Sequence, residues 1–208
     1  MTLIRDLKAA AIKRALFPAG ASLDAPAVFA LVRDMPYRRA SSHEPAVTIE
    51  EWRGTCSGKH ILLQSLFEEL RMGTMMILAL HEFTALNSPW LSPSLLTMLH
   101  EAPVRDVHNF LRVQPLAQLG PQAEWVTVDA TWPLAVRKLG IPVNEILDLK
   151  NDMGIAADPD EVFHVPPDTD PSELKERILQ DLSPGELTRR EEFLAKFMDW
   201  LGEALPVT

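Results

Sequence analysis

The residues of this chain that could do chemistry together are one cysteine, one histidine and one aspartate. Cys56 is the only cysteine, and it lies where a glycine-bearing loop meets the apolar pattern of an amphipathic helix. His108 and Asp129 follow, each within a run of residues that favour β-strands. A thiol at a helix start, a histidine base and a carboxylate that orients the base are the groups that nucleophilic catalysis by cysteine requires.

Each of these residues has an expected role. A thiol with its ordinary pKa of about 8.5 is mostly protonated at neutral pH, so it needs activation. The start of a helix stabilises a thiolate, and a nearby histidine can take the proton. We expect Cys56 to be the nucleophile, His108 the general base and acid, and Asp129 the residue that orients the imidazole. The backbone amide of Cys56 and the indole N–H of Trp52 are the expected donors to an oxyanion.

Other readings of the same residues remain open. His60 lies one helical turn after Cys56 and is the main rival base, and His81 is a weaker rival. A lone cysteine is often simply a buried apolar residue. His108 could be a histidine on a sheet whose hydrogen bonds are satisfied, and Asp129 could cap the end of a strand.

The spacing of His108 and Asp129 fits a β-hairpin. Residues 104–113 and 125–132 predict two strands joined by a loop that contains a Gly-Pro pair. If paired residue numbers sum to 237, His108 faces Asp129 across the ladder and the turn centre falls between residues 118 and 119. A shift of one residue would send the two side chains to opposite faces of the sheet.

The remaining patterns predict the elements that position these residues. Leucines at helical spacing predict a helix over 56–71, and an apolar run over 74–83 predicts a buried strand. Between residues 88 and 99 we expect one helical turn, and over 148–170 a segment rich in Asp and Pro that wraps the surface. The other expected helices are at 3–16, near 26–33, a turn at 48–51 opened by a capping box, from 170 to about 182, and from 183 to about 205.

Composition narrows the class of protein. The chain has 208 residues, enough for one domain with a sizeable core, and its net charge of -9 argues against a nucleic-acid partner. One cysteine cannot form an intramolecular disulfide, and the histidines lack metal-ligand spacing, so we expect no metal and no cofactor. No apolar stretch is long enough for a membrane span and no signal peptide is seen. These features favour a cytoplasmic protein.

The chain resembles the transglutaminase-like superfamily of cysteine enzymes. The resemblance covers about residues 48–133 and rests on Arg-Gly-Thr-Cys at 53–56, a strand with His108, and Trp-Val-Thr-Val-Asp-Ala-Thr-Trp at 125–132. It implies an α+β fold with a papain-like core, in which the helix that bears the cysteine packs on an antiparallel sheet. The helices over about 170–205 would then be a C-terminal extension within a single domain, 1–208.

The function expected from this combination is cysteine-dependent acyl chemistry. The substrate would be a peptide, a protein or a small amide, and the acyl group would pass through a thioester to water or to an amine. Two alternatives remain: a small-molecule acyltransferase of the arylamine acetyltransferase kind, and a non-catalytic interaction domain on the same fold.

Overall fold

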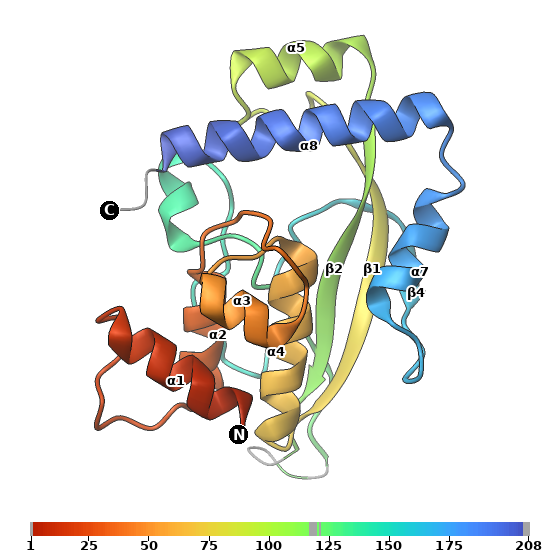
Figure 1. Cartoon of the computed structure of the whole chain (residues 1–208). Helices are drawn as coiled ribbons and strands as arrows, with labels where there is room; N and C mark the ends of the chain where they lie inside the picture. The colour runs from red at the N-terminus through yellow and green to blue at the C-terminus, as the bar shows by residue number, and fades with distance from the viewer. Residues whose placement is uncertain (1, 117–119, 121, 206–208) are drawn as a thin grey trace.

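One antiparallel sheet with helices packed around it makes up the fold (Figure 1). The structure is a computed structural model that describes residues 2–116, 120 and 122–205. Within them, four strands lie in the order β3-β2-β1-β4. The strands are β1 (Gly73–Phe83), β2 (Val104–Gln114), β3 (Val126–Val128) and β4 (Pro159–His164). The helices are α1 (Leu3–Lys13), α2 (Ala25–Arg33), α3 (Pro45–Glu51), α4 (Cys56–Glu69), α5 (Pro93–Glu101), the 3-10 helix η1 (Leu134–Leu139), α7 (Pro171–Leu179) and α8 (Pro184–Ala204). The expected α+β class is confirmed.

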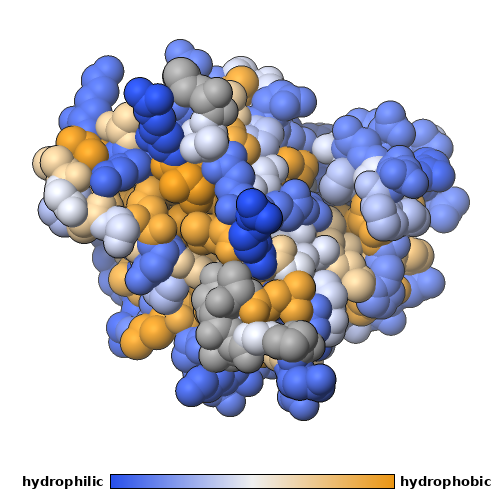
Figure 2. Space-filling model, turned by 90° about the horizontal axis from the view of Figure 1, so that it is seen from below, coloured by the Kyte–Doolittle hydropathy of each residue, from blue (hydrophilic) through white to orange (hydrophobic). Residues whose placement is uncertain are grey.

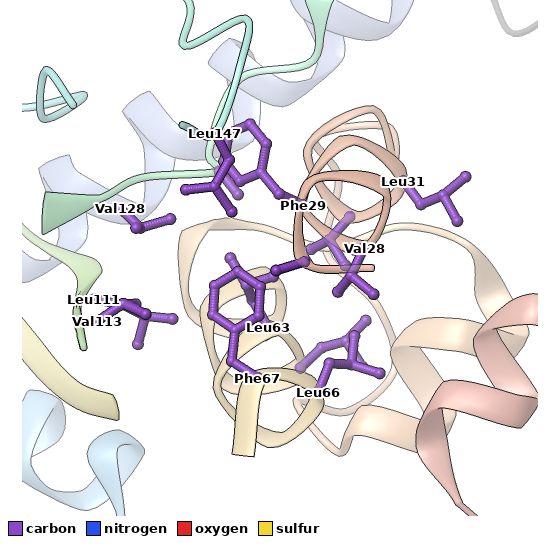
Figure 3. Close-up of a cluster of buried hydrophobic side chains, with 14 of the residues drawn as sticks. Val28, Phe29, Leu31, Leu63, Leu66, Phe67, Leu111, Val113, Val128 and Leu147 are labelled. Carbon is purple, nitrogen blue, oxygen red and sulfur yellow. The ribbon is translucent and has the colours of Figure 1, made fainter. Parts of the chain in front are cut away.

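The position of the cysteine is set by the packing of α4. Its apolar stripe includes Leu63, Leu66 and Phe67, which are fully buried. Figure 3 shows Leu63 and Phe67 of this stripe between α2 and the labelled residues of β2 and β3. Each buried side chain of this size contributes about 1.5–3 kcal/mol, so α4 is held firmly against the sheet. The helix and the buried strand expected after it are both confirmed, with small differences at their ends.

A second apolar cluster holds the C-terminal helix. Phe193, Phe197 and Leu201 of α8 are buried against Leu95 of α5 and Val104 of β2. Figure 1 shows α8 crossing one end of the long strands β1 and β2. The helix begins with the predicted capping box, in which the side chains of Ser183 and Glu186 bond each other's backbone N–H groups.

The hairpin register differs from the prediction. Leu111 pairs with Val128 and Val113 with Val126, so paired numbers sum to 239 rather than 237. A shift of two residues keeps every side chain on its expected face, so Asp129 is a diagonal rather than a direct neighbour of His108. The predicted turn centre at residues 118 and 119 lies outside the described residues.

The strand expected over 125–132 is also much shorter, because it ends at Val128. The backbone that follows bonds to α4 instead of to β2. The Ala130 N–H donates to Nε2 of His60 (2.9 Å), and the Thr131 carbonyl accepts from Nζ of Lys59 (2.9 Å). These bonds tie the first turn of α4 to the segment that carries Asp129.

Two further local predictions were wrong. Thr48 does not cap a helix, because α3 begins at Pro45 and buries Thr48 in its interior. The single turn expected between residues 88 and 99 is the nine-residue helix α5, which starts at Pro93. The segment 148–170 includes β4, which pairs with β1 and whose residues are mostly exposed, in line with the surface position expected for it.

The surface at the end of the molecule opposite α8 is mostly hydrophilic, with one gathering of hydrophobic residues. Seen from the end opposite α8, the molecule has a mostly hydrophilic outline with hydrophobic residues gathered near the middle of the view (Figure 2). In the described part of the chain, no helix is both long and apolar enough to cross a membrane.

Candidate active site

A buried histidine and a buried aspartate form the centre of the site. Nε2 of His108 lies 2.8 Å from Oδ2 of Asp129. The carboxylate also accepts backbone N–H groups from Thr131 (2.9 Å, to Oδ1) and Ala156 (2.8 Å, to Oδ2). Burial alone would raise the pKa of Asp129, but the charge and hydrogen bond of His108 hold it well below its usual range. The carboxylate is therefore charged and fixed in orientation.

The thiol lies at the first residue of α4. The Lys59 N–H bonds the Thr55 carbonyl, so the N–H groups of the first three helical residues have no partner within the helix. Burial raises the pKa of Cys56, but the charge of Lys175 and a hydrogen bond with His108 lower it to about 6. A large share of Cys56 is therefore thiolate at neutral pH.

The pKa of His108 moves in the opposite direction. Burial lowers it, but the charge and hydrogen bond of Asp129, together with Cys56, raise it to about 10. Since Nε2 of the ring bonds Asp129, the other nitrogen, Nδ1, is the one left for the thiol. The opposite directions of the two pKa shifts favour a thiolate beside an imidazolium at neutral pH. The structure brings these two residues and Asp129 together.

The rival base His60 has a structural role. Its Nδ1 lies 2.8 Å from the Cys56 carbonyl, and its Nε2 accepts the Ala130 N–H. Nδ1 therefore carries the proton, and neither nitrogen is left for the thiol. Burial lowers the pKa of His60 to about 4, so the ring is neutral.

The weaker rival, His81, lies in strand β1 beside His108. It is directly opposite Asp106 in the β1–β2 ladder, and its ring centroid is 6.3 Å from that of His108. Burial lowers its pKa to about 4.

Tyr37, the only tyrosine, was not expected at the site. Its backbone forms a bridge with Gly54, and its ring centroid lies 4.6 Å from that of Trp132. The phenol therefore sits between the cysteine loop and the segment after Asp129, near Cys56. Burial and the nearby charge of Cys56 raise its pKa well above the ordinary value, so it stays protonated. No local pattern around Tyr37 signals this contact.

Lys175 of α7 was also missed. Its Nζ bonds the Val107 carbonyl and lies 3.3 Å from Oγ of Ser57 and 3.4 Å from Oδ1 of Asn109. These bonds fix the ammonium group beside the first turn of α4. Its charge is the largest of the effects that lower the pKa of Cys56. The sequence interval between Lys175 and Ser57, 118 residues, explains why spacing could not reveal the contact.

A buried ion pair lies close to the site. Nε and Nη2 of Arg190 in α8 lie 2.8 and 2.6 Å from Oδ1 of Asp106 in β2. Burial raises the pKa of Asp106, but the charges of Lys175 and Arg190 lower it to about 2. Lysine and arginine from the C-terminal helices therefore balance the charges of the site.

Trp52 lies in a different environment from the one expected. It adopts the left-handed conformation (φ 52°) and is packed in the main apolar core. The guanidinium of Arg14 lies 4.8 Å from its ring centroid. Among the described residues its indole N–H has no hydrogen bond, so nothing in the structure directs it at the thiol.

A cavity of about 290 Å³ opens next to Asp129. His81, Trp90 and Trp132 are among the residues that line it. In the described part of the chain, no group of three or more His, Cys, Asp or Glu residues is arranged to hold a metal ion.

Comparisons of the chain with protein-family models, with curated proteins and with solved structures find no match.

Proposed function

We propose that the protein is a cysteine-dependent enzyme that breaks an amide or peptide bond through a thioester intermediate. One observation carries the proposal: Asp129 bonds Nε2 of His108 at 2.8 Å, which leaves Nδ1 for a thiol whose pKa is lowered to about 6. A thiolate and a proton donor are then present together at neutral pH, as amide cleavage requires.

The reaction follows from these groups. The Cys56 thiolate attacks the acyl carbon and forms a tetrahedral oxyanion. The carbon–nitrogen bond then breaks as the His108 imidazolium gives its proton to the leaving amine, and a thioester remains on Cys56. His108, now neutral, takes a proton from water or from a second amine, which attacks the thioester and releases the thiolate. Asp129 keeps the imidazole oriented and stabilises its charged form throughout.

Two donors are proposed for the oxyanion: the backbone N–H of Cys56 and the hydroxyl of Tyr37. The N–H is one of the groups at the start of α4 without a partner within the helix. Tyr37 takes the place that we expected for Trp52, because its phenol lies near Cys56 while Trp52 lies in the core. Removing one such donor slows the chemical step about 10²–10³-fold, so Tyr37→Phe should reduce the acylation rate by that factor.

The proposal includes the family suggested by the motifs. A nucleophile helix, α4, in contact with an antiparallel sheet that carries His108 fits the papain-like arrangement of transglutaminase-like enzymes. A free catalytic thiol also suits a reducing compartment, so we propose that the enzyme works in the cytoplasm.

Trapping of the acyl-enzyme tests the function. The full-length protein is incubated with libraries of activated amides and peptides, quenched in acid and analysed by intact mass. We expect a mass increase equal to the acyl group, located on Cys56 and absent in Cys56→Ser. Acylation of lysines with Cys56 unmodified across the libraries would contradict the proposal.

A further inference from the structure

The cavity beside Asp129 has features that the triad does not use. Aromatic rings of Phe83, Trp90 and Trp132 form much of its wall. Its polar lining includes His81, Asn144 and Asp158. Aromatic walls with a few polar groups are typical of a binding site for a small organic group.

His81 is the clearest sign that the cavity binds a ligand. The side chain is only 4% exposed, yet in the described part of the chain neither ring nitrogen has a hydrogen-bond partner. Its nitrogens are not among the fully enclosed side-chain atoms without a partner in the described part of the chain, so they are open to the cavity and available to a ligand. Because burial lowers its pKa to about 4, the ring is neutral, and one nitrogen can accept a hydrogen bond while the other can donate one.

Other side chains of the lining also have free hydrogen-bonding groups. Both hydrogens of the Asn144 amide are used, since Nδ2 donates to the carbonyls of Asp129 and Gly154 (2.9 Å each). This leaves Oδ1 of Asn144 as an acceptor. Asn87 uses one N–H of its amide for the Glu82 carbonyl and keeps the second, and the indole N–H groups of Trp90 and Trp132 make no hydrogen bond among the described residues. The lining therefore offers both donors and acceptors, and its charge is what distinguishes one class of ligand from another.

The charges of the lining favour a cation. Three carboxylates line the cavity, and none of its described lining residues is Lys or Arg. Glu82 is paired with Arg105 (2.9 Å) and Asp129 with His108, whereas Asp158 is exposed and has no salt bridge among the described residues. One uncompensated negative charge beside two tryptophan rings is a setting that attracts an organic ammonium group.

We propose that this cavity binds a non-reacting organic ammonium group of the substrate, carried on a short alkyl or arylalkyl stem. Cys56 is not among the described residues of the lining, while Asp129 is, so the cation is held on the Asp129 side of His108. The role of the cavity as a substrate site rests on the proposed function; the binding of the cation does not.

Binding of three probes to the wild-type protein tests the inference. Phenethylammonium, phenethyl alcohol and 3-phenylpropionate have the same aromatic ring and differ in the group at the end of the stem. By titration calorimetry we expect the ammonium probe to bind about tenfold more tightly than the alcohol, and the carboxylate to bind more weakly than both. Equal affinity for the ammonium and the carboxylate, or no binding of the ammonium, would overturn the inference.

Two matched variants locate the site. Asp158→Asn should weaken binding of the ammonium probe about tenfold. Asp160→Asn removes the same charge from an exposed residue outside the described lining and should leave the affinity unchanged. Equal losses in the two variants would mean a general charge effect and would refute the site. Thioester formation on Cys56 is measured separately by mass. Failure of the proposed enzyme function can therefore be distinguished from failure of the proposed ammonium site.

Discussion

Two buried histidines near the thiol differ in how their ring nitrogens are used. His108 gives one nitrogen to Asp129 and keeps the other for Cys56. His60 uses both nitrogens to join α4 to the segment after Asp129. In the proposed mechanism, the same type of side chain therefore serves as a base at position 108, while at position 60 it stabilises the fold.

Substitution of each histidine should separate these roles. His108→Ala should move the pKa of Cys56 up toward its ordinary value of about 8.5, because a hydrogen bond and a positive charge are lost. His60→Ala should leave the thiol pKa low and reduce the free energy of unfolding by about 3 kcal/mol. The pH dependence of alkylation by iodoacetamide and urea unfolding measure the two effects. The reverse pattern would make His60 the base.

The ammonium group of Lys175 should act on the thiol from α7. Lys175→Met removes a cation that lowers the pKa of Cys56, so at about pH 5 the rate of alkylation should fall about tenfold. Lys196→Met, at an exposed position of α8, is the matched control and should not change the rate. If both variants behave alike, Lys175 has no specific influence on the thiol.

At the scale of elements, the C-terminal helices are joined to the sheet by charge as well as by apolar packing. Arg190 of α8 makes two bonds to the buried carboxylate of Asp106 in β2. A buried ion pair adds little net stability, but removing one partner leaves an uncompensated charge.

Arg190→Met should therefore be strongly destabilising. We expect the free energy of unfolding to fall by about 3 to 5 kcal/mol in urea. Arg39→Met breaks an exposed pair with Glu191, and the loss there should be below about 1 kcal/mol. Similar losses in the two variants would show that the buried pair does not hold α8.

The elements that the sequence predicts well are those with local causes. The leucine stripe of α4, the apolar run of β1 and the capping box of α8 depend on neighbouring residues alone. The position at which β3 ends has no such local cause. It depends on whether the backbone after Val128 bonds β2 or the side chains of Lys59 and His60, which is settled only when α4 packs in place.

The candidate site, too, could be predicted from the sequence only in part. The motifs indicated Cys56, His108 and Asp129, because helix starts and strands have recognisable patterns. Tyr37 and Lys175 reach the thiol through a loop and through α7, and no periodicity links them to it. Trp52 illustrates the reverse: it is close to Cys56 in sequence, but its ring packs in the core.

At the scale of the whole molecule, the buried neutral histidines make stability depend on pH. His60 and His81 have pKa values lowered to about 4 by burial, against about 6.5 in an unfolded chain. Between these values the unfolded state binds more protons than the folded state. The stability that the two neutral rings contribute is therefore fully present above about pH 6.5 and is lost as the pH falls through about 4.

The expected loss by about pH 4 is about 3 kcal/mol for each of these histidines. Urea unfolding at several pH values between these limits measures it, and His81→Gln should make the dependence less steep. A free energy of unfolding that stays constant over this range would contradict the neutral state of both rings.

The activation of Cys56 is the central claim, and the ultraviolet absorbance of the thiolate tests it most directly. Because the chain has a single cysteine, the difference in absorbance between the wild type and Cys56→Ser reports this residue alone. The difference should appear as the pH rises, with an inflection at about 6, and should persist through neutral pH. An inflection near 8.5, the value of an unactivated thiol, would contradict the account.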